Sequence, residues 1–253
     1  MNFRSSRFAD DPVLFAILND PDTGTRKLQP GSNAESVKRL QQALWDLWWV
    51  NHVAPEVLHD DFVIGIYGPK TMQAVKAYKT QYDIHFPPSA PTGFIDEFAG
   101  PRTFARLDGH CVQLDTAVTA ILTKMIALQA DNPPDLNPNK VPTSVVIPVR
   151  RTRGCKKQIV LNTADGQVRG DIYFRQGIGA FEVHDRISDF YRGTAGGPSG
   201  ALGFPVSDEE DAGPGRRRNR FEGGELVLDL ASGAVTQALN GVVVDFGDPQ
   251  LVF

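Results

Sequence analysis

The sequence predicts an α+β protein in which a small helical bundle domain, built on a pseudo-repeat, is linked to a small β-rich domain. Apolar residues in the first half recur at spacings of three and four, which is typical of amphipathic helices. After residue 145, short β-branched runs alternate with Gly, Asp and Asn turns, which is typical of strands. The predicted parts are an N-terminal arm at 1–27, a helical domain at 28–130, a Pro- and Asn-rich linker at 131–144 and a β-rich domain at 145–253.

The first half contains four segments with helical periodicity. Residues 32–49 carry an apolar stripe that begins with Val37 and Leu40, and Ser32 with Glu35 forms a candidate capping box at its start. The other predicted helices span residues 71–82, 101–107 and 112–128.

The second half has the pattern of short strands and hairpins. Turn pairs such as Asp165-Gly166 and Gly223-Gly224 separate its β-branched runs. One short helix is predicted at 184–191, and strands are predicted at residues 145–149, 158–161, 226–230 and 242–246.

A short internal repeat lies within the helical half. Residues 68–71 and residues 100–103 both have the order Gly-Pro-basic-Thr, and each is followed by apolar residues three apart. Gly permits a tight entry, and Pro at the first helical position loses no needed N–H. The repeat predicts two similar helix starts in a pseudo-symmetric bundle, and by itself it identifies no ligand.

The segment 28–108 resembles the peptidoglycan-binding domain type 1. The resemblance lies in the order of a Val-x-x-Leu-Gln helix, a Gly-x-x-Thr turn, a second helix and a final Gly-x-x-Thr. Two positions depart from the family pattern, since Ile64-Gly65 replaces Asp-Gly and Tyr78-Lys79 replaces Phe-Gln. The resemblance implies a helical module that binds carbohydrate or stem peptide. The ligand-binding residues that it implies are Tyr67, Thr71, Tyr78 and Thr103.

The segment 180–236 resembles an LGFP repeat. The shared residues are Gly196-Gly197, then Leu202-Gly203-Phe204-Pro205, and then Phe221-Glu222-Gly223-Gly224. The resemblance implies a module that attaches secreted proteins to envelope polysaccharide, and a single copy should bind weakly. Aromatic side chains of this segment could stack on a sugar ring or pack in the core, and Asp208-Glu209 also matches the repeat. The candidates are Tyr191, Phe204, Asp208, Glu209 and Phe221.

Thiol and metal chemistry have little support in the sequence. Cys111 follows His110, and Cys155 could meet His184 in space, but no nucleophile signature surrounds either cysteine. Two unpaired, buried thiols are favoured over a disulfide. The His and Asp residues within 52–61 lack metal-ligand spacing and fit a solvated loop. No catalytic residue, metal or cofactor is therefore predicted.

The charged runs allow two interpretations. The acidic residues 208–211 are contiguous, unlike the separated carboxylate pair of a glycosidase. The basic residues within 216–220 could meet an anionic wall polymer or pair with that acidic run. The net charge of −4 argues against a nucleic-acid partner. No run approaches the roughly 20 apolar residues of a membrane span.

These observations predict a non-catalytic protein that binds peptidoglycan or wall polysaccharide through two weak modules. The apolar stretch 12–18 does not fit a secretory signal peptide, so we expect synthesis in the cytoplasm and action at the envelope or outside the cell. One alternative is a component or cargo of a phage-tail-like contractile injection particle, which residues 6–14 resemble and which would supply a particle protein as partner. A second alternative is an endolysin-like peptidoglycan hydrolase.

Overall fold

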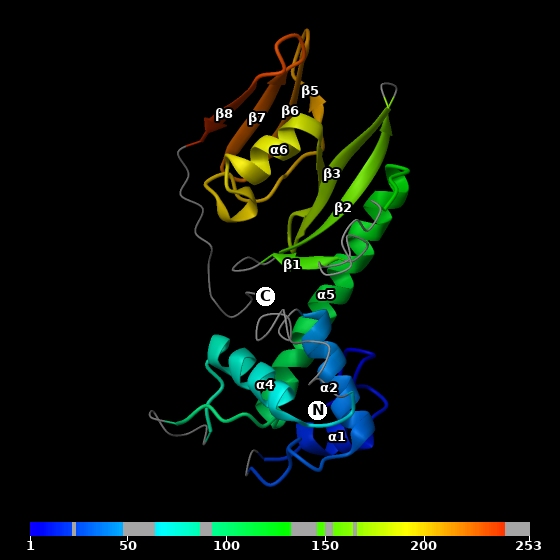
Figure 1. Cartoon of the computed structure of the whole chain (residues 1–253), viewed down its shortest axis with the longest axis vertical. Coiled ribbons are helices and arrows are strands. Elements are labelled where there is room, and N and C mark those ends of the chain that lie inside the picture. Colours follow the sequence, from blue (N-terminus) through cyan, green and yellow to red (C-terminus); the bar gives the residue numbers. More distant parts are fainter. Residues whose placement is uncertain are drawn as a thin grey trace. The chain divides into compact units, whose positions relative to one another are not determined.

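The computed structural model describes residues 1–21, 24–47, 64–86, 93–132, 146–149, 154–163 and 166–240. The chain divides into two compact units, Met1–Leu114 and Asp115–Phe253, which we call the helical unit and the β unit. The division falls within helix α5 (Pro101–Ala127). Helices together with two four-stranded antiparallel sheets confirm the α+β class (Figure 1). Within the described ranges, no helix is long and apolar enough to cross a membrane.

The helical unit is built from α1 (Pro12–Leu18), α2 (Ala34–Asp46), α4 (Pro69–Gln81) and the first part of α5. The predicted helix at 32–49 is α2, and its apolar stripe is buried. The predicted capping box is wrong. Asn33 is the N-cap, and its side-chain oxygen accepts hydrogen bonds from the backbone N–H groups of Glu35 and Ser36.

Residues of the predicted N-terminal arm contribute to the core of the helical unit. Asp11 caps α1 and also accepts a 2.8 Å hydrogen bond from the Ser36 hydroxyl. The backbone N–H groups of Arg4 and Ser5 donate to the Asp108 carboxylate. Aromatic rings from the chain start and from α5 meet edge to face, and the buried rings are Phe3, Phe8 and Phe104.

The two helix starts of the internal repeat have matching geometry. Pro69 begins α4 and Pro101 begins α5, and the carbonyls of Gly68 and Gly100 accept the first helical hydrogen bonds. The sequence prediction separated residues 101–107 from 112–128, whereas α5 is continuous. A helix tolerates one glycine such as Gly109 at about 1 kcal/mol, and buried residues continue the apolar face across it.

The β unit contains two antiparallel meanders. The first sheet has the order β1-β2-β3-β4, with β1 (Ile147–Val149), β2 (Gly154–Thr163), β3 (Gly166–Arg175) and β4 (Gly179–His184). Helix α6 (Asp185–Gly193) and the short 3-10 helix η1 (Gly197–Ser199) follow. The second sheet has the order β5-β6-β7-β8, with β5 (Glu210–Asp211), β6 (Arg216–Phe221), β7 (Gly224–Asp229) and β8 (Val235–Leu239).

The predicted strands at 145–149, 158–161 and 226–230 correspond to β1, β2 and β7, and the predicted helix at 184–191 is α6. The strand predicted at 242–246 lies outside the described residues, as does most of the predicted linker. Figure 1 shows α6 beside the two sheets, and the core of the β unit contains buried residues of α6 and of both sheets. Its buried members are Tyr173, Val183, Ile187, Tyr191, Leu202, Phe204, Phe221, Leu226 and Leu228.

Candidate functional site

The turn before α4 is held by one buried side chain, Gln41 of α2. Its amide oxygen accepts a 2.8 Å hydrogen bond from the Gly65 N–H, and its amide nitrogen donates to the Ile66 carbonyl and the Thr71 hydroxyl, both at 3.0 Å. The Tyr67 hydroxyl donates to the Glu97 carbonyl at 2.9 Å. Thr71 and Tyr67 therefore stabilise the turns of the helical unit.

Tyr78 forms a buried pair with His110 of α5. The Tyr78 hydroxyl lies 2.9 Å from His110 Nδ1. Burial, reinforced by the positive charge of Arg106, lowers the pKa of His110 to about 4. Burial also raises the pKa of Tyr78 above its usual value. Both side chains are therefore neutral at pH 7 and belong to the core.

The LGFP-like residues form the core of the β unit. Tyr191 donates a hydrogen bond from its hydroxyl to the Gly203 carbonyl. The Phe204 ring meets Tyr173 edge to face, with the ring centroids 6.5 Å apart. The Glu222 carboxylate accepts a 2.8 Å hydrogen bond from the Phe204 N–H and pairs with Arg175.

Seven of the predicted ligand-binding residues are at most 3% exposed, so their side chains do not offer a surface on which a polymer could stack. The motifs that they belong to are explained by folding, because each side chain packs in the core or bonds a turn. Burial favours the core interpretation over direct ligand binding for six of these residues, whereas Thr103 also lines a pocket. The seven residues are Tyr67, Thr71, Tyr78, Thr103, Tyr191, Phe204 and Phe221.

The two acidic candidates form ion pairs inside the β unit. Asp208 pairs with Lys124 and accepts a hydrogen bond from the Glu182 N–H. The Glu209 carboxylate lies 2.9 Å from Arg217 Nε and 3.4 Å from His184 Nε2. Both carboxylates are therefore partnered within the β unit.

The basic run pairs with the acidic run, which decides between the two interpretations of the charged segments. Arg218 Nε lies 2.8 Å and Arg220 Nε 3.0 Å from the Glu210 carboxylate. Although partial desolvation opposes ionisation, the hydrogen bonds from Arg218 and Arg220 outweigh it and lower the pKa of Glu210. The runs thus form a ladder of ion pairs along β5 and β6.

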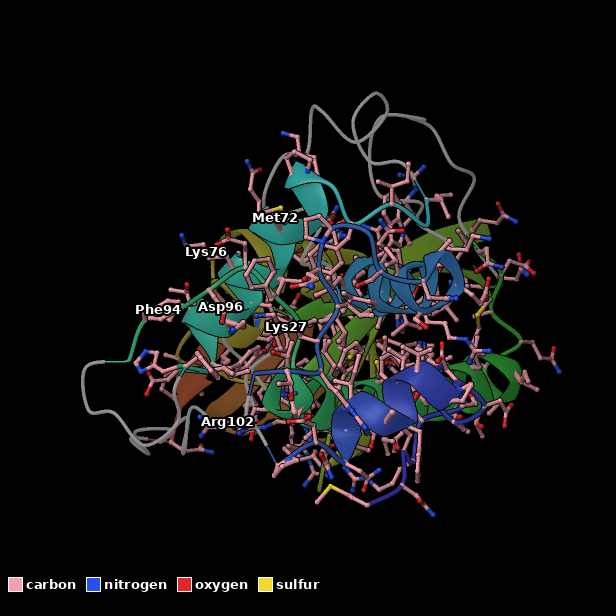
Figure 2. The ribbon with its side chains drawn as sticks, turned by 90° about the horizontal axis from the view of Figure 1, so that it is seen from below. Lys27, Met72, Lys76, Phe94, Asp96 and Arg102 are labelled. Atoms are coloured by element: carbon pink, nitrogen blue, oxygen red, sulfur yellow. The ribbon has the colours of Figure 1, made fainter. Side chains whose placement is uncertain are left out.

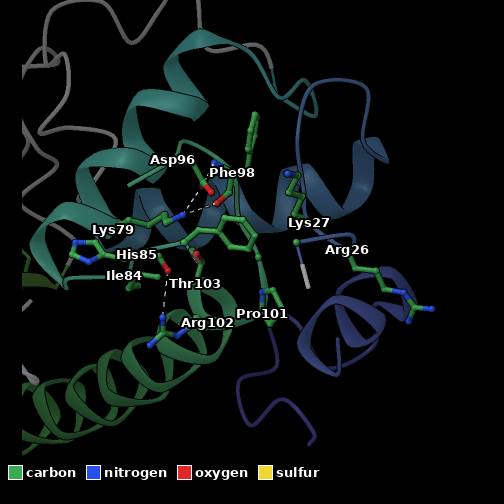
Figure 3. Close-up of a pocket in the computed structure, with 13 residues that line it drawn as sticks. Arg26, Lys27, Lys79, Ile84, His85, Asp96, Phe98, Pro101, Arg102 and Thr103 are labelled. Atoms are coloured by element: carbon green, nitrogen blue, oxygen red, sulfur yellow. Dashed lines mark hydrogen bonds and ion pairs between the residues drawn. The ribbon is translucent and has the colours of Figure 1, made fainter. Parts of the chain in front are cut away.

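A small pocket of about 30 Å³ lies at the start of α5 in the helical unit (Figure 3). A space of that size admits about one small polar group. Thr103 is the one predicted site residue on its wall. The lining residues are Gly24, Arg26, Lys27, Lys79, Ile84, His85, Phe86, Asp96, Phe98, Gly100, Pro101, Arg102 and Thr103.

A buried ion pair forms one wall of the pocket. Lys79 Nζ lies 2.5 Å from Asp96 Oδ1, and it also donates to the Phe98 carbonyl at 3.4 Å (Figure 3). Asp96 Oδ1 accepts a 2.9 Å hydrogen bond from the Phe98 N–H. The pair contributes no net charge, so the charge of the pocket depends on its other residues.

The remaining charge of the pocket is positive. Lys27 Nζ lies 4.6 Å from the centre of the Phe98 ring, and Arg102 donates to the His85 carbonyl at 3.3 Å. Figure 2 shows Asp96 beside α4 and Arg102 at the start of α5. Arg26 and Lys27 have no ion pair with any residue that the structure describes. The sequence does not predict this pocket, because its residues come from three separated segments.

Other sites raised by the sequence lie elsewhere in the chain. Cys111 and Cys155 are buried and form no disulfide, as favoured, and burial raises the pKa of the Cys155 thiol to about 12. In the described portion of the chain, no three His, Cys, Asp or Glu side chains are grouped to hold a metal. The candidate metal loop at 52–61 lies outside the described residues.

Comparison of the sequence with models of protein families and with curated proteins finds no match.

Proposed function

We propose that this chain is a non-catalytic protein that binds the cell wall, through peptidoglycan or envelope polysaccharide, using one weak site in each unit. The observation that carries the proposal is the basic pocket at the start of α5. Its walls at α4 and the start of α5 lie in the segment 28–108 that resembles a peptidoglycan-binding domain, and wall polymers carry carboxylates that such a pocket would attract. The β unit enters the proposal through its resemblance to LGFP repeats.

The burial of the motif residues determines where contact with a wall would occur. Because the motif aromatics fill the cores, a polymer would contact surface groups such as those around the pocket. A pocket of about 30 Å³ encloses only one end group, so the affinity of a single site should be low. Two linked weak sites that reach the same polymer would raise the apparent affinity by effective concentration.

Sedimentation with isolated cell walls tests this function. We expect the purified full chain to appear in the pellet at low salt and to return to the supernatant as salt screens the exposed charges. The turbidity of the wall suspension should stay constant. A chain that remains in the supernatant at every salt concentration contradicts wall binding, and falling turbidity would instead establish a hydrolase.

A further inference from the structure

The two repeats of the helical unit place different side chains at the same structural position. Val37-x-x-Leu40-Gln41 in α2 and Val75-x-x-Tyr78-Lys79 in α4 have the same spacing. Gln41 donates to the Ile66 carbonyl, and Lys79 donates to the Phe98 carbonyl. Ile66 and Phe98 each lie two residues before a repeated Gly-Pro. Lys79 is therefore the structural counterpart of Gln41.

Because of this difference, protein side chains fill the space at the turn of the first repeat, whereas a pocket remains at the turn of the second repeat. At the first turn, Gln41 bonds the Thr71 hydroxyl at 3.0 Å, so the space is filled by the protein itself. At the second turn, Lys79 is held by Asp96, and a pocket remains beside Thr103. Thr103 is 1% exposed and lines this pocket, and its hydroxyl has no hydrogen bond with the residues that the structure describes.

The surroundings of the open turn favour an anion. Arg26, Lys27 and Arg102 line the pocket, while the one carboxylate on its wall, Asp96, is already paired with Lys79. The pocket also includes the first residues of α5, a 27-residue helix whose N-terminal backbone N–H groups attract negative charge. The space of about 30 Å³ suits one carboxylate rather than a whole sugar.

We infer that the pocket at the second repeat binds a carboxylate group, with Lys27, Arg102 and the Thr103 hydroxyl as its donors and Arg26 as an attracting charge at the rim. The identity of the polymer that carries this carboxylate rests on the proposed function, but the charge of the group does not. Lys79 and Asp96 are positioning residues, because their pair maintains the wall of the pocket without supplying net charge.

Titration of the ¹⁵N-labelled full chain by NMR tests the inference. We use N-acetylmuramic acid, and its methyl ester serves as the uncharged control. The acid should shift the backbone amide signals of Gly100, Arg102 and Thr103, and the ester should not. Acetyl-D-alanyl-D-alanine, which carries a peptide carboxylate, shows whether the glycan or the stem peptide supplies the group. Equal shifts by acid and ester, or no shifts with either carboxylate, would overturn the inference, as would a response to inorganic phosphate alone.

Charge variants provide a second readout. Replacing both Lys27 and Arg102 with Gln should weaken binding of the responding carboxylate by about tenfold or more, since charge-assisted hydrogen bonds are lost. Lys70→Gln is the matched control, because Lys70 has the place of Arg102 in the first repeat and does not line the pocket. Equal effects of the Lys70 variant and the pocket variant would overturn the inference.

The wall assay and the NMR titration can fail separately. If the chain sediments with walls but both carboxylates leave the pocket amide signals unchanged, the pocket inference is wrong and the wall-binding proposal stands. If the carboxylates bind in the pocket but walls do not retain the chain, the proposed function is wrong and the carboxylate site stands.

Discussion

Gly154, the first residue of β2, lies against the buried ring of Phe204. A Cβ atom at this position would be 2.3 Å from the Phe204 ring and 2.4 Å from the Phe174 carbonyl. Real Cβ contacts are never so short, and the neighbours are a packed ring and a backbone atom. The LGFP-like Phe204 thus depends on a glycine that is 50 residues away in the sequence.

Gly154→Ala should therefore destabilise the β unit by about 3 kcal/mol, the upper range for overpacking a core. The NMR signals of backbone amides in β2, β3 and β7, followed during urea unfolding, measure the effect in the β unit alone. The matched control is Gly193→Ala, because a Cβ at Gly193 meets no atom within 4 Å and its backbone is helical. If both variants unfold at the same urea concentration, the close approach at Gly154 does not control stability.

His110 should make the stability of the helical unit depend on pH. Its pKa is about 4 in the folded chain against an ordinary 6.5, so the unfolded chain binds more protons between these values. The contribution of His110 to the free energy of unfolding is therefore fully present above pH 6.5. This free energy falls by about 3 kcal/mol as the pH decreases to 4. Urea unfolding followed by tryptophan fluorescence measures this, since the tryptophans at 45, 48 and 49 all lie in this half.

The control for this pH effect removes the buried pair without leaving a lone hydroxyl. The double variant His110→Leu with Tyr78→Phe replaces both partners of the 2.9 Å contact. Its stability should change less between pH 6.5 and 4 than that of the unaltered chain. An identical pH dependence in the two proteins would assign the acid sensitivity to other groups.

At the scale of elements, Gln41 joins α2 to the start of α4. Its hydrogen bonds to Gly65 and Thr71 are buried, and its hydrogen bond to Ile66 is partly buried. Gln41→Ala should lower the free energy of unfolding of the helical unit by about 2 to 3 kcal/mol, because buried polar groups lose their partners. Its neighbour Gln42 is exposed and bonds only Asp46 among the described residues, so Gln42→Ala should have an effect below about 1 kcal/mol. Equal losses would contradict the assignment of Gln41 as the residue that holds this turn.

The elements that the sequence predicts correctly are those with a strong local signal. The apolar stripe of α2 and the Gly-Pro starts of α4 and α5 are local patterns that survive folding. The sequence does not predict strand β6 (Arg216–Phe221), because its many arginines lack the β-branched pattern of a strand. This run forms a strand because its partners, the acidic residues of β5 and the apolar residues of β7, lie across the sheet.

The candidate site required information that no local pattern contains. Arg26, Lys79 and Arg102 come from three segments that only the folded helical unit brings together. In the sequence, Lys79 stands out as a departure from the family pattern, and Thr103 as a predicted site residue. The sequence could not show that Asp96 neutralises Lys79, because that pairing depends on the loop before α5.

At the scale of the whole molecule, the two units have separate cores. The β unit is packed around Tyr173, Tyr191 and Phe204, and the helical unit around buried residues such as Leu40 and Phe104. Helix α5 belongs to both units, since the division falls between Leu114 and Asp115. Whether this shared helix couples the unfolding of the units is therefore a measurable property of the chain.

We expect the two units to unfold in two transitions, because each buries its own apolar core and multi-unit chains depart from two-state behaviour. Gly154→Ala should shift the transition of the β unit, followed by the NMR signals of its strand amides, and leave the tryptophan-reported transition of the helical unit in place. Gln41→Ala should do the reverse. Differential scanning calorimetry of the unaltered chain and both variants gives an independent measure. If each variant shifts both transitions equally, α5 transmits stability between the units and they unfold as one.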